Sequence, residues 1–302
     1  MHCYFIVAIC AWTLVSFLPG RAPAATLKPV NPQFIQNGHL KLGIDLGSGG
    51  SIFYLSELPG DRNLLNHFDR GRFVQQSYYG AKDGSLWVDK PWRWNPVQGG
   101  GYKGEPAKVL KSVLEGNQLS VASRPKHWAT GEDVNEATLE ESIDLTDRLA
   151  HVHYKFTYTG NIDHPRTDQE LPAVFVDYAL PNLVSYQGAH PWTNDALTRT
   201  VPGFPNEKHS ADENWAAYVD GNDWGVGVYF PGTNRLTAYR AKANLTAGPE
   251  GAACSYFAPL QTLAITRGWV YEYDIYLAIG KVADVREQFR RLRDSASAKA
   301  RP

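Results

Sequence analysis

The sequence has little cysteine: three of its 302 residues, of which Cys3 and Cys10 lie at the very N-terminus. If the apolar N-terminus is removed, Cys254 is the single cysteine that remains. Neither an intramolecular disulfide nor a cysteine-based zinc site is then possible. We expect Cys254 to be a small buried hydrophobe.

The sequence also lacks a basic tract, and its formal net charge is only −1. Nucleic acid and anionic membrane surfaces are therefore not expected as partners, because both attract clustered lysine and arginine. No phosphate-binding loop, nucleotide fingerprint or serine-nucleophile elbow occurs, and we expect no cofactor. A polyanionic substrate is still compatible with this charge, since a few local arginines suffice to bind one.

The first 24 residues predict a signal peptide. Residues 1–18 are almost wholly apolar, Pro19 and Gly20 end the run, and Ala22-Pro-Ala24 offers the small residues of a cleavage site. An uncleaved anchor is the alternative, because no lysine or arginine precedes the run. We expect a secreted or periplasmic protein with no membrane contact after cleavage. It would comprise a lead-in over 25–38, a single domain over 39–294 and a disordered tail over 295–302.

Alternation of apolar and polar residues dominates the rest of the chain and predicts β-strands. The expected strands are His39–Asp45, Ser51–Leu58, Ala107–Leu114, Gln118–Arg124, Ala137–Asp144, Ala150–Thr159, Pro172–Tyr178, Trp215–Asp220, Gly225–Phe230, Leu236–Lys242, Ala258–Ile265 and Val270–Ala278. Only Val282–Asp294 has the spacing of an amphipathic helix. The expected fold is all-β, an antiparallel β-supersandwich of stacked large sheets with one C-terminal helix.

A stretch rich in aromatic and amide side chains, residues 71–104, interrupts the strands. Its rings could pack on the C–H face of a sugar while its planar polar groups pair with hydroxyls. The alternative is that some of the aromatics belong to the sheet core. The predicted substrate-binding residues here are Arg72, Gln75, Gln76, Tyr78, Tyr79, Trp92, Trp94, Asn95 and Gln98.

A second irregular stretch, residues 182–214, is expected to form the opposite wall of a groove. Long ordered loops in compact domains usually carry function. His190 and Trp192 lie at its centre, and His127 and Trp128 would add a further base and stacking surface.

Carboxylates near the irregular stretches are the candidates for hydrolysis, which uses two carboxyl groups. Glu170 and Asp177 come first, and Asp195, Asp212 and Glu213 follow. Elimination from a uronate polymer needs instead a base and a group that neutralises the substrate carboxylate. The residues that could supply both are Arg72, Gln76, Tyr78, Asn95, His127 and His190.

A metal site is not expected. His151 and His153 point to one face of a strand, but no third ligand accompanies them, and solvent-facing strand histidines are the better explanation.

Four segments suggest a known order of elements: an opening hairpin at 42–55, middle strands at 137–144 and 149–160, and closing strands at 258–276. This order resembles the galactose-mutarotase-like family of sugar-processing folds. The resemblance implies a supersandwich and, in mutarotases, a histidine acid and a glutamate base that interconvert sugar anomers. Polysaccharide lyases and glycosidase modules share the same fold.

The sequence departs from the mutarotase pattern at the catalytic positions. His190-Pro-Trp192 resembles the family's His-Pro-aromatic element, but the aligned position is closer to Asp177. No residue closely matches the late catalytic glutamate, and Glu272 lies in an alternating strand. Simple anomer interconversion is therefore less expected than the fold alone would imply.

Together these features indicate an exported enzyme that binds an oligo- or polysaccharide in an aromatic groove and cleaves glycosidic linkages, by hydrolysis or β-elimination. An aldose epimerase and a non-catalytic carbohydrate-binding protein are the alternatives. The sequence does not specify the sugar, the catalytic pair or the oligomeric state.

Overall fold

The structure is a computed structural model that describes residues 27–241 and 246–299. The predicted signal peptide lies outside the described residues, so export stays a prediction. Within the described part of the chain, no helix is long and apolar enough to cross a membrane.

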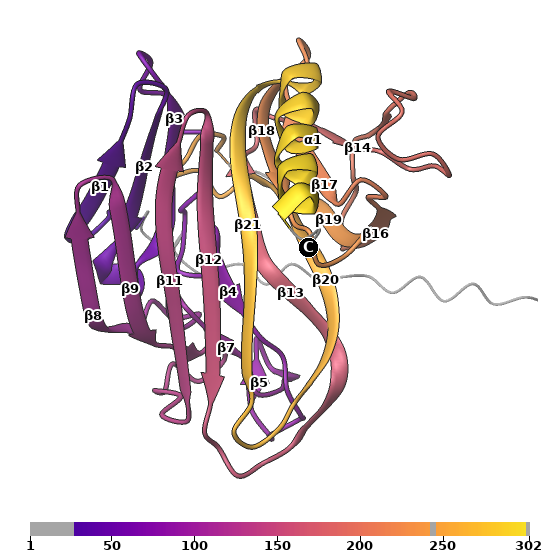
Figure 1. The fold of residues 1–302 in the computed structure, drawn as a ribbon. Helices are drawn as coiled ribbons and strands as arrows, with labels where there is room; N and C mark the ends of the chain where they lie inside the picture. Colours follow the sequence, from indigo (N-terminus) through magenta and orange to yellow (C-terminus); the bar gives the residue numbers. More distant parts are fainter. Residues whose placement is uncertain (1–26, 242–245, 300–302) are drawn as a thin grey trace, which may run out of the picture.

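The larger sheet has nine strands, and every neighbouring pair in it is antiparallel. It crosses Figure 1 from β8 to β14. In spatial order its strands are β15 (Thr198–Thr200), β14 (Asn182–Ser185), β17 (Trp215–Val219), β18 (Trp224–Tyr229), β21 (Val270–Lys281), β12 (Leu149–Tyr158), β11 (Ala137–Thr146), β9 (Gln118–Arg124) and β8 (Lys108–Glu115).

The second sheet has seven strands and lies behind the first in Figure 1. Its order is β10 (Lys126–His127), β7 (Pro96–Val97), β4 (Gln75–Ser77), β13 (His164–Asp177), β20 (Cys254–Ile265), β19 (Arg235–Ala241) and β16 (Glu207–Ser210). Three further strands, β1 (Pro32–Gln36), β2 (Leu40–Asp45) and β3 (Ser51–Glu57), form a small sheet, and β5 (Leu86–Trp87) and β6 (Lys90–Pro91) form a hairpin.

The main core fills the space between the two large sheets. Along β12 every second residue is buried, and Val152 and Tyr154 have no exposed surface. They belong to the same apolar cluster as Val174 and Val176 of β13. The two-residue period that predicts these strands thus also specifies which of their faces is buried.

The outer face of the nine-stranded sheet carries α1 (Val282–Lys299), the one α-helix among the described residues. Val285 and Phe289 of α1 pack into one cluster with Trp215 and Tyr229. The helix stripe read from the sequence is therefore a packing surface.

The predicted fold class is confirmed, and each of the twelve predicted strands is present: Gln118–Arg124 has the predicted ends, and every other strand differs at one end or both. The predicted strand Pro172–Tyr178 begins earlier, at His164, so that Glu170 lies inside β13. The segment 25–38 is more than a lead-in, because β1 pairs with β2 along its whole length.

The predicted disordered tail is wrong over residues 295–299, which continue α1. Ala296, Ala298 and Lys299 favour helix, so the helix does not end where its apolar stripe ends. Residues 300–302 lie outside the described part.

Candidate active site

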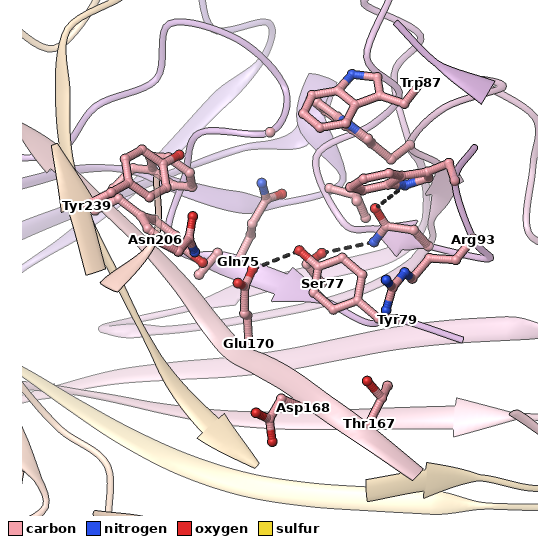
Figure 2. Close-up of a pocket in the computed structure, with 18 residues that line it drawn as sticks. Gln75, Ser77, Tyr79, Trp87, Arg93, Thr167, Asp168, Glu170, Asn206 and Tyr239 are labelled. Atoms are coloured by element: carbon pink, nitrogen blue, oxygen red, sulfur yellow. Dashed lines mark hydrogen bonds between the residues drawn. The ribbon is translucent and has the colours of Figure 1, made fainter. Parts of the chain in front are cut away.

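A cavity of about 480 Å³ opens on the outer face of the seven-stranded sheet. Figure 2 shows it between β13, the strands β19 and β20, and the loops around β4 and β7. The residues that line it are Gly71, Gln75, Ser77, Tyr79, Trp87, Trp92, Arg93, Asn95, Val97, Trp128, Thr167, Asp168, Glu170, Ala173, Phe175, Asn206, Tyr239 and Tyr256.

Glu170 is the titratable group at the centre of this cavity. The Tyr79 hydroxyl donates a 2.7 Å hydrogen bond to its Oε2 (Figure 2). Burial raises the pKa of the Glu170 carboxyl, and this outweighs the hydroxyls of Tyr79 and Tyr256, which act to lower it. A carboxyl with a raised pKa beside neutral hydroxyls is suited to take up and return a proton.

A β-bulge brings Glu170 to the cavity side. The pairing of β13 with β20 shifts register between Glu170 and Val174, and the pairing with β4 shifts between Glu170 and Ala173. Pro172 lies within this irregularity, and as a proline it has no N–H to donate to a ladder. The extra residue places Glu170 on the face of Ala173 and Phe175, whereas Leu171 packs inward.

The second carboxylate of the cavity, Asp168, has a different environment. Its Oδ1 accepts from Thr262 at 2.6 Å and from Arg235 at 3.2 Å, and Lys208 lies 3.4 Å from Oδ2. The Thr262 hydrogen bond, followed by the contacts from Arg235 and Lys208, keeps the pKa of Asp168 below its usual value. Asp168 is therefore a paired, ionised group.

One wall of the cavity is a set of aromatic rings on the sheet. The Tyr256 ring lies 4.5 Å from that of Phe175 and 4.6 Å from that of Tyr239, centroid to centroid. Cys254 and Ala258 share a cluster with these rings. Tyr256 and Phe175 are 2% and 7% exposed, and Tyr239 is the more exposed ring of this wall. Aromatic rings that line a cavity are a surface on which a sugar can pack.

A second aromatic wall comes from the 71–104 stretch and from Trp128. The rings of Trp87 and Trp92 are 4.7 Å apart, and those of Trp87 and Trp128 are 6.1 Å apart. The Trp92 Nε1 donates to Asn95 Oδ1 at 3.2 Å. Five of the predicted binding residues line the cavity, namely Gln75, Tyr79, Trp92, Asn95 and Trp128, as does the predicted catalytic residue Glu170.

The side-chain amides of residues 71–104 mainly form hydrogen bonds with backbone groups. Gln75 Oε1 accepts from the Gly99 N–H at 2.7 Å, and Asn95 Nδ2 donates to the Tyr78 carbonyl at 2.7 Å. Gln76 and Gln98 are buried away from the cavity, where Gln76 donates to the Glu140 carbonyl and Gln98 accepts from the Gln76 N–H. Amide density here reflects a loop whose buried backbone groups need partners.

Two predicted stacking residues belong to the core. Tyr78 is fully buried and stacks on Phe156 at 4.1 Å. Trp94 is 7% exposed, stacks on His164 at 4.1 Å and donates through Nε1 to Glu136 at 2.9 Å. Trp94 points inward and Trp92 lines the cavity although they are two positions apart, so residues 92–94 do not keep the alternation of a regular strand.

Arg72 and His127 are near the site but support its loops. Arg72 pairs with Asp69 at 3.3 Å and donates to the Ala252 carbonyl. His127 Nε2 lies 2.8 Å from Asp83 Oδ2, and its Nδ1 accepts from the N–H groups of Ala129 and Thr130, so the proton lies on Nε2.

Asp177, His190 and Trp192 do not line the cavity. Asp177 accepts from the N–H groups of Ala179 and Gly248 and pairs with Arg62 at 3.4 Å. Trp192 packs in the cluster under α1. The His190 side chain is 77% exposed, with Asp195 at 3.9 Å.

The wall predicted from His190 to Asp195 is therefore on a different face of the molecule. The segment 182–214 contributes Asn206 to the cavity instead. Asp195, Asp212 and Glu213 also lie off the cavity, and Glu213 forms a buried pair with Arg286 of α1.

No group of three or more histidine, cysteine, aspartate or glutamate side chains within the described residues could hold a metal ion. His151 lies 2.8 Å from Asp274 and 3.0 Å from Asp144, and His153 lies 3.0 Å from Asp274. These are hydrogen-bonded pairs on an outward-facing sheet surface.

Sequence reasoning missed the sheet wall of the cavity: Ser77, Thr167, Phe175, Asn206, Tyr239 and Tyr256. For part of this wall the sequence does contain a pattern that could have indicated it. Tyr256 alternates with Cys254 and Ala258, which places one large ring between two small side chains on the same face of β20.

No family model matches the sequence, and no curated protein matches it. Solved structures do share its fold. A galactose mutarotase related enzyme from Lactobacillus acidophilus has a TM-score of 0.52 and 9% identity, over 82% of this chain and 97% of that one. A galactose mutarotase-like protein from Lactobacillus casei has a TM-score of 0.52 and 12% identity, over 82% of this chain and 100% of that one.

The same fold occurs in other contexts. A TPR-domain containing protein from Parabacteroides distasonis has a TM-score of 0.50 and 12% identity, over 81% of this chain but 46% of that one. At such identities the likeness shows a galactose mutarotase-like fold, and the residues must carry any argument for activity.

Proposed function

We propose that this chain is a sugar-binding enzyme that transfers protons at the anomeric centre, in the manner of an aldose epimerase. The observation that supports this most is Glu170: a carboxyl of raised pKa, held by the Tyr79 hydroxyl in a cavity with aromatic walls. The mutarotase-like fold supports a carbohydrate ligand.

The reaction needs a proton acceptor and a proton donor. Glu170 takes the proton from the C1 hydroxyl while the bond between C1 and the ring oxygen breaks, and a donor protonates that oxygen. The open-chain aldehyde turns about its C1–C2 bond and closes on the other face, and both protons return to their sources. The step therefore consumes no net proton and transfers no electron.

Tyr239 is the proposed donor, because its ring lines the cavity and no described residue hydrogen-bonds its hydroxyl. Tyr79 is engaged with Glu170 and orients it. No histidine lines the cavity among the described residues, so a tyrosine takes the place of the histidine acid that the family resemblance implied.

Hydrolysis, the main sequence-based prediction, has less support. It needs two carboxyl groups on opposite sides of the scissile bond. Glu170 and Asp168 are the acids among the described lining residues, but they are two positions apart on one strand, and Asp168 is already paired.

The test is anomer exchange measured by NMR for a panel of free aldoses with the purified protein. We expect exchange faster than in buffer for at least one sugar, and a loss of roughly 100-fold or more in Glu170→Gln. Glu115→Gln, an exposed change at the end of β8, is the control.

Three other outcomes contradict the proposal. Unsaturated products from a uronate polymer indicate elimination, and new reducing ends without unsaturation indicate hydrolysis. Binding without any chemical change indicates a non-catalytic carbohydrate-binding protein.

A further inference from the structure

Arg93 is the only basic side chain among the described residues that line the cavity. It is partly buried, and its guanidinium carbon lies 5.9 Å from the centre of the Tyr79 ring. It has neither an ion pair nor a hydrogen bond to a described residue. Figure 2 places it beside Tyr79, on the side of the ring away from Glu170.

The backbone around Arg93 is fixed. The Trp94 N–H donates to the Ala81 carbonyl at 2.9 Å, and the Trp94 carbonyl accepts from Gly80 at 2.7 Å. The Trp94 side chain is anchored in the core. The Trp94 ring therefore points into the core, whereas the Arg93 side chain lines the cavity.

Several other buried or partly buried arginines have partners within the protein: Arg70 and Arg240 donate to carbonyl and hydroxyl oxygens. Arg286 pairs with Glu213, and Arg72 pairs with Asp69. Neither carboxylate of the cavity forms an ion pair with Arg93. Asp168 pairs with Arg235 and Lys208, and Glu170 accepts a hydrogen bond from the Tyr79 hydroxyl. A partly desolvated guanidinium without an anion is unfavourable, which suggests that the anion arrives with the ligand.

We propose that the sugar bound in this cavity carries a carboxylate, as a uronic acid does, and that Arg93 binds this carboxylate. The guanidinium plane matches a carboxylate with two parallel hydrogen bonds. A single unpaired cation balances a monoanion, whereas a phosphate dianion would leave one charge uncompensated near two acids. The inference rests on the proposed function, and it names the substrate class of that site.

The experiment compares the affinities of glucuronate, galacturonate, their neutral parent sugars and glucose 6-phosphate, by calorimetry and by competition. We expect the uronates to bind more tightly than their parents. Arg93→Gln should reduce this ratio of affinities roughly 10- to 100-fold, the worth of a charge-assisted pair. Arg93→Lys should restore part of it, and Arg166→Gln, an exposed arginine outside the cavity, should leave it as in the wild type.

Each outcome decides something. Equal affinity for uronate and parent sugar overturns the inference, as does a ratio of affinities that is unchanged in Arg93→Gln. Tighter binding of glucose 6-phosphate than of the uronates would show that the preferred anion is a phosphate and not a carboxylate. Because affinity is measured without turnover, Arg93-dependent uronate binding with no anomer exchange refutes the proposed function alone. Anomer exchange on neutral sugars without uronate preference refutes the inference alone.

Discussion

Two glutamates of raised pKa, Glu141 and Glu170, lie on different layers of the molecule. Glu141 projects from β11 into the core, is 3% exposed and accepts one hydrogen bond, from Gln98 Nε2 at 3.0 Å. Burial raises its pKa to about 8, against the effect of Gln98. Glu170 is also desolvated, but it faces a cavity and has tyrosine hydroxyls beside it.

The difference shows that a raised pKa reports burial, whereas chemistry also requires access. Glu141 Oε1 is buried and has no hydrogen-bond partner, so its surroundings disfavour the ionised carboxylate. Glu170 has room for a substrate hydroxyl against its carboxylate. We therefore assign proton transfer to Glu170 in the cavity, the outer site, and a cost in stability to Glu141 in the core, the inner site.

The largest expected effect is on turnover. Glu170→Gln should lower the anomer exchange rate by roughly 100- to 10,000-fold, because the amide cannot accept the proton. Glu141→Gln, an identical change in the core, should retain activity in its folded fraction. The measurement is NMR exchange normalised to folded protein.

A drop of similar size in both variants would break the comparison, because the core glutamate would then matter to the chemistry. Thermal melting curves of both variants supply the folded fraction.

The next effect separates two tryptophans that are two positions apart. Trp94→Ala should cost about 3–5 kcal/mol of stability, since it removes a buried ring stacked on His164. Trp92→Ala should cost less and weaken sugar binding roughly tenfold, because this ring lines the cavity. Denaturant melts and calorimetric titration test the pair, and a reversed pattern would place Trp94 at the site.

Much of the fold follows from local pattern. In β12 and β11, alternation predicts both the strands and their inner faces, because one face is buried and the other is not. The helix α1 follows from its apolar stripe, but its C-terminal end does not. Short strands such as β4 and β16 are held by neighbours distant in the sequence, so no local pattern specifies them.

The site was harder to predict, for two physical reasons. Period-two alternation puts Glu170 with Val174 and Val176 on the core side, and only the bulge reverses this. The sheet wall of Tyr239 and Tyr256 comes from strands that are far from the aromatic stretch in sequence. Amides that satisfy backbone groups cannot be told from ligand-binding amides without the fold.

The third prediction concerns pH. Glu141 has a folded-state pKa of about 8, above its unfolded value of about 4.3, so the native state binds more protons between these values. Stability should therefore fall from about pH 4.5 to pH 8 by a few kcal/mol and then level off. Glu141→Gln, which does not titrate, should lack this slope.

The readout is the difference between the wild-type and Glu141→Gln unfolding free energies across pH 5–8. The variant leaves a buried amide donor unpartnered, so it should be the less stable protein at pH 5. If the unfolding free energies of the two proteins change in parallel with pH, ionisation of Glu141 costs no stability. The contrast between Glu141 and Glu170 would then be wrong.

The smallest effect tests how the outer site is held. Asp83 accepts from Ser85 and from His127, and so ties the hairpin that carries Trp87 to the turn that carries Trp128. Asp83→Ala should cost about 1 kcal/mol or less, as expected for a partly exposed cluster, and weaken sugar binding a few-fold. Asp89→Asn at the exposed hairpin tip is the control.

The same contact gives a pH dependence of opposite sign to that of Glu141. Burial acts to raise the pKa of Asp83, but hydrogen bonds from Ser85 and His127 outweigh it and leave the pKa lowered. Its stabilisation is thus present above the unfolded value of about 3.9 and is lost as pH falls through the folded value. Wild-type sugar binding should weaken below about pH 4 toward the level of Asp83→Ala. Equal sugar binding by the wild type and Asp83→Ala at every pH would show that the hydrogen bonds of Asp83 are not needed to position Trp87 and Trp128.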